Sequence, residues 1–177
     1  MAIAVDIRPW SEGDLPLLER LLGDPAMTVH LGGPETPTQL RDRHERYCLF
    51  THTGPGCMYV ILVGDEKVPA GSVGFWETEW RGGIVWETGW SVLPEFQGQG
   101  VATSGTILIV GKARAENTHR FLHTFPSIQN APSNAICRKA GFTFMEESEF
   151  EYPPGNLIRC NDWKLDLYDI SNKKSPG

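Results

Sequence analysis

A strand, an abrupt stop and a glycine-bearing loop that leads into a helix occupy residues 87–113, and this segment constrains the fold most. Residues 86–93 are rich in aromatic and β-branched side chains, as strands are, and Pro94 ends the run because it has no N–H to donate. Two glycines follow within residues 97–102, and a helix is predicted over 101–120. The unpaired N–H groups at such a helix start favour phosphate or pyrophosphate. The segment therefore predicts a site for a phosphorylated cofactor.

Length and composition indicate one globular domain. The chain has 177 residues, 40% hydrophobic and 21% charged, so residues 1–170 are predicted to form a single domain and residues 171–177 a polar tail. A net charge of −6 without a basic stripe argues against a nucleic-acid partner. No apolar run approaches the ~20 residues that span a bilayer, which argues against a membrane partner.

The cysteines and the N-terminus indicate the compartment. Cys48, Cys57, Cys137 and Cys160 form no Cys-x-x-Cys pair, so neither a zinc knuckle nor a dense disulfide framework is expected. The N-terminus lacks the basic-then-apolar layout of a signal peptide. A cytoplasmic protein with reduced thiols is predicted.

Hydrophobic periodicity and turn residues predict the element order β-α-α-β-β-β-α-β-α-β-β. The expected strands cover 3–7, 58–63, 70–77, 84–93, 121–125, 142–147 and 161–168. The expected helices are one that Ser11 caps and Gly23 ends, one over 39–50 capped by Thr38, and two over 101–120 and 133–139. This order predicts an α/β (α+β) fold with a mixed sheet of about seven strands, antiparallel around its hairpins and parallel where helices intervene.

A second motif lies at residues 130–142, where Pro132 suits a helix start that is entered at Asn130 or Ala131. Two nucleotide-binding alternatives fit the glycine loop poorly. A dinucleotide fingerprint would place glycine where Thr103 stands and an acid after the strand that Pro126 ends. A phosphate-binding Gly-x-x-x-x-Gly-Lys run does not occur.

Together the two motifs resemble the GNAT superfamily of acyl-CoA-dependent N-acetyltransferases. The family's Gln/Arg-x-x-Gly-x-Gly/Ala loop is matched by Gln97, Gly100 and Ala102. Its later Asn-x-x-Ser/Ala element ending in Gly-Phe is matched by Asn130, Ser133, Gly141 and Phe142. The resemblance implies a sheet splayed between its fourth and fifth strands and acetyl-CoA as acyl donor, without a metal. The serine resembles the branch that includes ribosomal-protein N-terminal acetyltransferases.

The resemblance also assigns the residues that hold CoA. The CoA pyrophosphate is expected to bind the amides of Gln97, Gly98, Gln99, Gly100, Val101, Ala102 and Thr103. The pantetheine arm of CoA is expected to pair with Val92 and Leu93. The pantetheine and phosphate side of CoA is expected to lie near Asn130, Asn134 and Arg138.

Acetyl transfer requires an amine that loses a proton before it attacks the thioester. The resemblance favours a strand carboxylate as base, and Glu87 lies six residues before Leu93 on the strand that would carry the acetyl site. An edge-facing or ion-paired structural role is the alternative for Glu87. Backbone N–H groups near Val92 or Leu93 are candidates to stabilise the oxyanion.

The general acid is where the sequence departs from the family pattern. Many members carry a tyrosine four residues before the Gly-Phe pair, and that position here is Cys137. A thiol can donate a proton, but buried cysteines are usually inert packing. Ser133 is the second candidate, and capping of the helix is its alternative role. The acid is also dispensable if the CoA thiolate leaves unaided.

The acceptor side carries no decisive motif. Trp76 and Trp80 lie at a hairpin end that borders the acceptor cleft in this fold, so they are candidate substrate-binding residues, with sheet packing as the alternative. His44, Cys48 and His52 share helical spacing, but no carboxylate pair supports a metal site.

The predicted function is direct transfer of an acetyl group from acetyl-CoA to a primary amine in a ternary complex. The alternative is a non-catalytic acyl-CoA-binding or regulatory module on the same fold. The acceptor is a small-molecule amine or a peptide or protein amine: the acidic balance favours a polyamine, an aminoglycoside-like compound or a basic peptide, and Ser133 favours a protein N-terminus. A homodimer is a compatible assembly.

Overall fold

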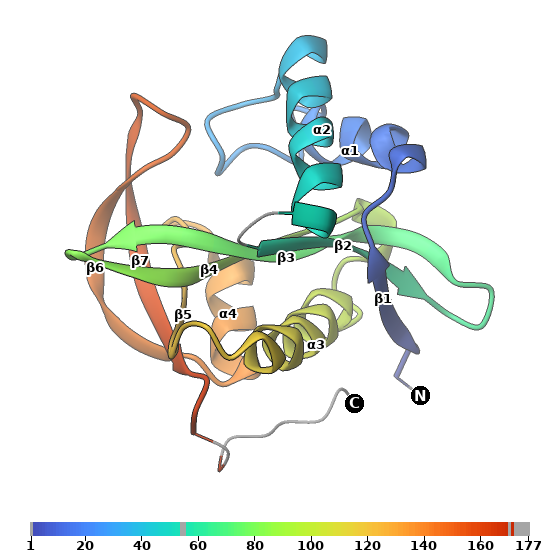
Figure 1. Ribbon diagram of the computed structural model, residues 1–177. Helices are drawn as coiled ribbons and strands as arrows, with labels where there is room; N and C mark the ends of the chain where they lie inside the picture. Colours follow the sequence, from blue (N-terminus) through green and yellow to red (C-terminus); the bar gives the residue numbers. More distant parts are fainter. Residues whose placement is uncertain (1, 54–55, 170, 172–177) are drawn as a thin grey trace.

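The computed structural model describes residues 2–53, 56–169 and 171, and it follows the predicted order of elements (Figure 1). Its strands are β1 (Val5–Pro9), β2 (Gly56–Val63), β3 (Val68–Trp80), β4 (Gly83–Val92), β5 (Phe121–Thr124), β6 (Thr143–Glu151) and β7 (Leu157–Asp166). Its helices are α1 (Leu15–Leu22), α2 (Pro37–Thr53), α3 (Val101–Glu116) and α4 (Ala131–Ala140), with short 3-10 turns at Glu12–Asp14 and Pro94–Phe96. Most of the predicted tail, residues 172–177, lies outside the described residues.

The strands form one sheet of seven in the order β1-β2-β3-β4-β5-β7-β6. All neighbours are antiparallel except β4 and β5, which run parallel. That parallel pair has only two registered positions, Trp86 with Leu122 and Glu87 with His123, and the strands then diverge. The predicted mixed sheet and the splay between its fourth and fifth strands are confirmed.

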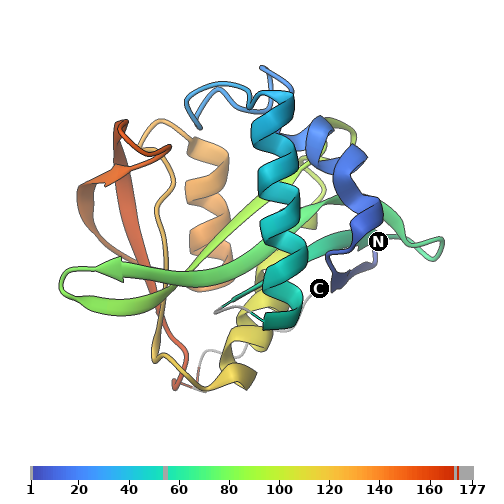
Figure 2. The same cartoon turned by 45° about the horizontal axis from the view of Figure 1, so that its top comes forward.

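Helices cover both faces of the sheet, α1 and α2 on one and α3 and α4 on the other (Figures 1 and 2). Because side chains alternate along a strand, neighbouring residues of β2 belong to different cores. Ile61 is buried in the core with α3, whereas Val60 is buried in the core with α1 and α2. On β4, Trp86 belongs to the α3 side. Glu87 therefore points to the α1–α2 side.

The start of α2 differs from its prediction. The helix begins at Pro37, two residues earlier than expected, and Thr36 rather than Thr38 caps it. The Thr36 N–H donates to Gln39 Oε1 at 2.8 Å, and the Gln39 N–H donates to Thr36 Oγ1 at 3.3 Å. This reciprocal pair is a capping box, and proline suits the first helical position that follows it.

The end of α3 also differs from its prediction. The helix stops at Glu116 rather than Arg120, because Asn117 adopts the left-handed conformation with φ 52°. The N–H of Asn117 donates to the carbonyl of Arg114 at 3.1 Å and closes the helix. Asparagine tolerates this conformation better than other non-glycine residues, so it acts as a helix terminator here.

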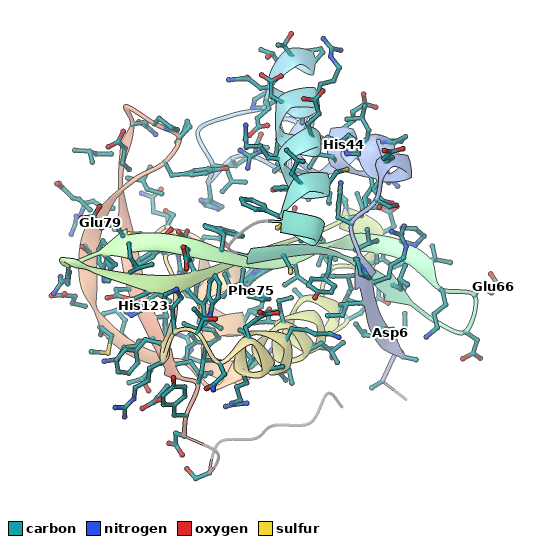
Figure 3. All side chains as sticks on the ribbon, viewed as in Figure 1. Asp6, His44, Glu66, Phe75, Glu79 and His123 are labelled. Atoms are coloured by element: carbon teal, nitrogen blue, oxygen red, sulfur yellow. The ribbon has the colours of Figure 1, made fainter. Side chains whose placement is uncertain are left out.

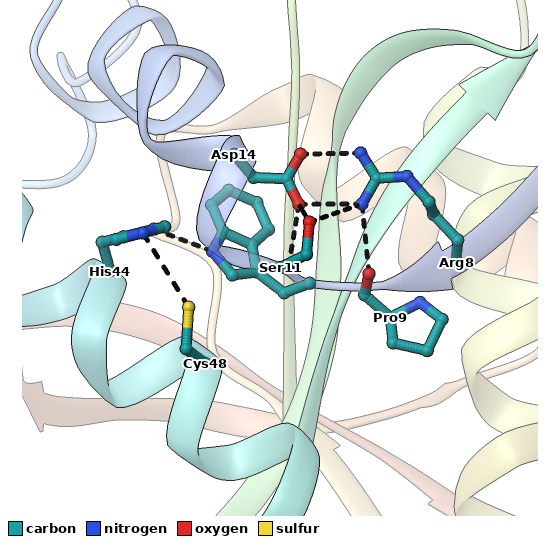
Figure 4. A network of polar contacts seen from close by, with 7 residues as sticks. Arg8, Pro9, Ser11, Asp14, His44 and Cys48 are labelled. Atoms are coloured by element: carbon teal, nitrogen blue, oxygen red, sulfur yellow. Dashed lines mark hydrogen bonds and ion pairs between the residues drawn. The ribbon is translucent and has the colours of Figure 1, made fainter.

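Polar contacts fix α1 and α2 to the start of the sheet (Figure 4). Arg8 on β1 pairs with Asp14 through two hydrogen bonds of 2.6 and 2.8 Å. The buried Trp10 donates from Nε1 to His44 Nδ1 on α2 at 3.1 Å, and His44 Nε2 lies 3.8 Å from Cys48 Sγ. These contacts hold both helices over one face, where residues of both border the cleft described below.

Candidate active site

A cleft of about 710 Å³ opens where β4 and β5 diverge. One wall is residues 88–92 of β4, and the opposite wall is residues 124–127 at and beyond the end of β5. The start of α3 and one face of α4 line one end, while the α1–α2 region and the tip of the β6–β7 hairpin line the other. The cleft thus connects the predicted phosphate loop with the side of the sheet to which Glu87 points.

The glycine loop forms an uncapped helix start. Gly98 and Gly100 adopt positive φ of 71° and 79°, which favours glycine. Gly100 is the N-cap of α3 and has no side chain to cap the helix; the N–H of Ser104 is the first to bond back, to the Gly100 carbonyl at 3.0 Å. The N–H groups of residues 101–103 therefore have no helical partner and lie at the cleft, as a pyrophosphate requires.

The two glutamines of this loop brace it. Gln97 lines the cleft, and its Nε2 donates to the Val92 carbonyl at 2.8 Å. Gln99 does not line the cleft, and its Nε2 donates to the Glu95 carbonyl at 2.9 Å. The structure thus assigns the side chains of both residues to holding the loop against the end of β4.

The end of β4 offers one of the two predicted oxyanion donors. The N–H of Leu93 donates to the Ala70 carbonyl at 2.8 Å, and the Leu93 side chain is buried in the core with α1 and α2. The prediction that Leu93 contacts the cofactor is therefore wrong. Because backbone groups alternate in direction along an antiparallel ladder, the N–H of Val92 points to the other edge, which faces the splay. Val92 lines the cleft, so its N–H remains a candidate donor.

Glu87 lies in the cleft and is held by two neighbours on β3. Its Oε2 accepts from Thr78 Oγ1 at 2.6 Å and from Trp76 Nε1 at 3.1 Å. Burial raises the pKa of Glu87 above its ordinary value, while these hydrogen bonds and the nearby His123 act in the opposite direction. A carboxylate with a raised pKa is a better proton acceptor than a solvated one, which suits a general base.

The two predicted acceptor tryptophans have different positions. Trp76 lines the cleft, and its ring packs over Gly89, where an added Cβ would lie 3.0 Å from the ring. Trp80 does not line the cleft; its Nε1 donates to Asp162 Oδ2 at 3.1 Å, and its ring packs against Phe125. The placement of Trp80 as a substrate-binding residue is therefore not supported.

A buried histidine next to Glu87 escaped the sequence analysis. His123, labelled in Figure 3, is in register with Glu87 across the parallel pair. Its Nδ1 lies 2.6 Å from Asp162 Oδ1, and both side chains are buried. The only sequence signal was the position of the histidine in a short strand that begins with two apolar residues, because its partner Asp162 is 39 residues away.

Residues at the start of α4 divide between the cleft and the core. Asn130 is the cap, since its Oδ1 accepts from the Ser133 N–H at 3.2 Å. Ser133 is thus the third residue of the helix rather than its cap, and it lines the cleft.

Asn134 does not line the cleft. Its Nδ2 donates to the Ser127 and Asn130 carbonyls at 3.0 and 2.8 Å, and its Oδ1 accepts from Asn161 and Trp163 at 2.8 and 2.9 Å. These bonds use its full hydrogen-bonding capacity for structure. The prediction that Asn134 binds the cofactor is wrong.

The next turn of α4 requires two further corrections. Cys137 is 0% exposed, and burial raises the pKa of its thiol to about 12, so it can neither reach the cleft nor act as the acid. Arg138 points away and stacks over the Trp163 ring at 5.7 Å. The cation of α4 that lines the cleft is Lys139, which the sequence analysis missed. Helical phase carries the signal: Pro132, Ile136 and Lys139 share a face at spacings of about four and three residues.

The described part of the chain holds no group of three or more His, Cys, Asp or Glu side chains that is arranged to bind a metal ion. His44 and Cys48 serve the packing of α2, and the side chain of His52 lies outside the described residues. Among the described helices, none has both the length and the apolar character that a membrane span needs.

Solved structures share this fold over nearly the whole chain. A GNAT-family acetyltransferase from Bacillus anthracis matches with a TM-score of 0.74 and 16% identity, covering 96% of this chain and 98% of that one. Spermidine N-acetyltransferase from Vibrio cholerae, solved with CoA and spermine, matches at 0.74 and 15%, covering 92% and 95%. An acetyltransferase from Salmonella typhimurium that modifies the N-terminal serine of a 50S ribosomal subunit protein matches at 0.71 and 22%, covering 92% and 94%.

These likenesses, with the splayed sheet and its uncapped helix start, define the class as an acetyltransferase fold. The family model described as the acetyltransferase (GNAT) domain matches residues 5–143. The chain therefore belongs to the GNAT family and is an N-acetyltransferase that uses acetyl-CoA. No curated protein matches it.

Proposed function

We propose that the protein transfers the acetyl group of acetyl-CoA to a primary amine by direct attack in a ternary complex. One observation carries this proposal: a single cleft joins the uncapped start of α3, the free edge of β4 and the buried carboxylate of Glu87. The first feature suits a pyrophosphate, the second suits a pantetheine arm and the third suits a protonated amine. The fold of the related acetyltransferases supports the same arrangement.

Glu87 is the proposed base. It accepts a proton from the ammonium group of the acceptor, directly or through one water molecule, and the freed nitrogen forms a bond to the thioester carbon. The N–H of Val92 donates to the carbonyl oxygen as negative charge develops there. Thr78 and Trp76 keep the Glu87 carboxylate oriented while it accepts the proton.

The hydroxyl of Ser133 is the proposed proton relay to the departing thiolate: as the C–S bond breaks, it gives its proton to the sulfur and takes one from the protonated nitrogen of the tetrahedral intermediate. It lines the cleft, and the capping role is taken by Asn130, so its position is compatible with this task. Cys137 is excluded by its burial. The pyrophosphate and phosphate groups of CoA are proposed to bind the amides of residues 98–103 with Lys139 nearby.

Direct attack is favoured over an acyl-cysteine route, because none of the four cysteines lines the cleft. All four are free thiols, which supports a reducing cytoplasm as the place of reaction.

The test is release of CoA thiol from acetyl-CoA across a panel of primary amines, followed by initial-rate measurements with both substrates varied. Intersecting lines in double-reciprocal plots are expected for a ternary complex. Parallel lines would indicate a covalent acyl-enzyme and contradict direct attack. Acetyl-CoA binding without thiol release from any amine would instead support the non-catalytic binding module.

A further inference from the structure

The acceptor end of the cleft has an apolar and aromatic lining. Its side chains come from α2, the α1–α2 connection, β3 and the β6–β7 hairpin, and include Met27, Leu31, Tyr47, Trp76, Tyr152 and Ile158. The Trp76 ring lies next to the Glu87 carboxylate, to which it donates a hydrogen bond of 3.1 Å. A carboxylate set in a largely apolar and aromatic lining is the pattern that orients one polar group of an otherwise apolar ligand.

The charges around the cleft are sparse and mostly positive. Among the described residues that line it, Glu87 is the only carboxylate, whereas His30, Arg43 and Lys139 carry basic groups. Arg43 is the basic group of the α2 wall, and its Nε donates to both Glu35 oxygens at 2.9 and 3.0 Å. Burial disfavours its charge, but the hydrogen bonds to Glu35 outweigh burial and raise its pKa, so Arg43 stays charged.

The same arginine helps to close the cleft. Its Nη2 donates to the Tyr152 hydroxyl at 3.2 Å, a contact that joins α2 to the β6–β7 hairpin. Beside it, the ring of Pro153 lies so close to Gly32 that an added Cβ there would be 3.1 Å from the proline Cδ. Figures 1 and 2 show this hairpin and the α1–α2 connection side by side. The acceptor must therefore fit under a bridge between two elements.

We infer that the acceptor is a small monoamine with an apolar body of aromatic size, rather than a polyamine, an aminoglycoside or a peptide. This inference rests on the proposed acetyl transfer. One ammonium pairs with Glu87, and the apolar body packs against Trp76 and Tyr47. A second ammonium would lose its hydration inside the cleft without a carboxylate to replace it, because Glu87 is taken by the first ammonium and Glu35 is already paired with Arg43. The bridge excludes the chain that follows a peptide N-terminus.

The test compares kcat/KM for 2-phenylethylamine and tyramine with that for spermidine, kanamycin and a tripeptide, using acetyl-CoA and detection of released thiol. The aryl monoamines are expected to exceed the other acceptors by about tenfold or more. A polyamine, an aminoglycoside or a peptide that is acetylated as well as the monoamines overturns this inference but leaves the acetyl transfer standing. If no thiol is released with any of these acceptors, nor with any further primary amine, both the inference about the acceptor and the proposed acetyl transfer are overturned.

A charge substitution tests the same inference within the protein. Ile158 on β7 lines the cleft, and its neighbour Leu157 is 66% exposed and does not line it. Ile158→Asp adds a second carboxylate and is expected to shift the spermidine-to-phenylethylamine ratio of kcat/KM toward spermidine by about tenfold. Leu157→Asp adds the same charge outside the cleft and is expected to leave the ratio unchanged. Equal ratios in both variants would overturn the inference, provided that both variants melt as folded proteins.

Discussion

Replacement of Glu87 by glutamine separates its chemical role from its structural one. Glutamine has nearly the same shape, and its Oε1 can accept the hydrogen bonds that Glu87 receives from Thr78 at 2.6 Å and Trp76 at 3.1 Å. It cannot accept a proton from an ammonium group. A general base is worth about 10² to 10⁴ in rate, which corresponds to about 3 to 5 kcal/mol of barrier. Glu87→Gln is therefore expected to lower kcat/KM by that factor.

The same substitution is expected to leave the protein at least as stable. Because burial raises the pKa of Glu87 in the folded state, its contribution to stability is present at low pH, below the unfolded pKa, and is lost as the pH rises through the folded pKa. Above the folded pKa the buried charge thus costs stability, and its removal costs none. The melting temperature of Glu87→Gln is expected to equal or exceed that of the parent, with the difference shrinking under acidic conditions.

The pH dependence of the parent enzyme follows from the same shift. Its kcat/KM is expected to rise with pH through a pKa above 4.5, the ordinary value for this group, and the limb due to Glu87 disappears in Glu87→Gln. Glu79 on the same hairpin is exposed and does not line the cleft, so Glu79→Gln is the matched control. Full activity in Glu87→Gln, or equal losses in both variants, would refute the role of Glu87 as base.

Two matched pairs test the fold and the loop. Trp10 and Trp86 are 2% and 3% exposed, but Trp10 Nε1 bonds to His44 while Trp86 Nε1 has no partner among the described residues. In urea denaturation Trp10→Phe is expected to cost about 1 to 2 kcal/mol more than Trp86→Phe, and equal costs would contradict the assigned hydrogen bond. Gly100 and Gly111 both have open space for a Cβ, yet only Gly100 has a positive φ, of 79°. Gly111→Ala is expected to raise the free energy of unfolding by about 0.5 to 1 kcal/mol. Gly100→Ala is expected to lower it by about 1 to 2 kcal/mol and to weaken acetyl-CoA binding. Changes of the same sign in the two variants would contradict this account.

The order of elements and the position of the glycine loop followed from the sequence because local rules determine them. Pro94 stops a strand, and Gly98 and Gly100 provide positive φ, wherever the strand lies in the sheet. The splay itself came from the family resemblance rather than from any local pattern. Boundaries depended on single side chains: Asn117 ended α3 early, and Thr36 moved the cap of α2.

The misassigned site residues share a physical cause, which is hydrogen bonding between residues distant in sequence. Asn134 is in the predicted motif, but Asn161 and Trp163 on β7 bind its side chain. The Leu93 N–H is taken by Ala70 on the neighbouring strand. The residues of a motif do not reveal which distant residues will form hydrogen bonds with them, so the sequence of the motif alone could not predict these contacts.

The choice between Arg138 and Lys139 is a different case, since it follows from helical phase. Residues that share a face with Pro132 recur at spacings of four and three, which selects Ile136 and then Lys139 rather than Arg138. Phase analysis of the motif would have found the lysine.

A crystal structure with CoA bound tests the central claim most directly. The pyrophosphate is expected within hydrogen-bonding distance of the amides of residues 98–103. The pantetheine arm is expected along the edge of β4 that ends at Val92, with its sulfur between Glu87 and Ser133. CoA bound outside the β4–β5 splay, or with its sulfur at the far end of the cleft from Glu87, would contradict the assignment of both the donor site and the base.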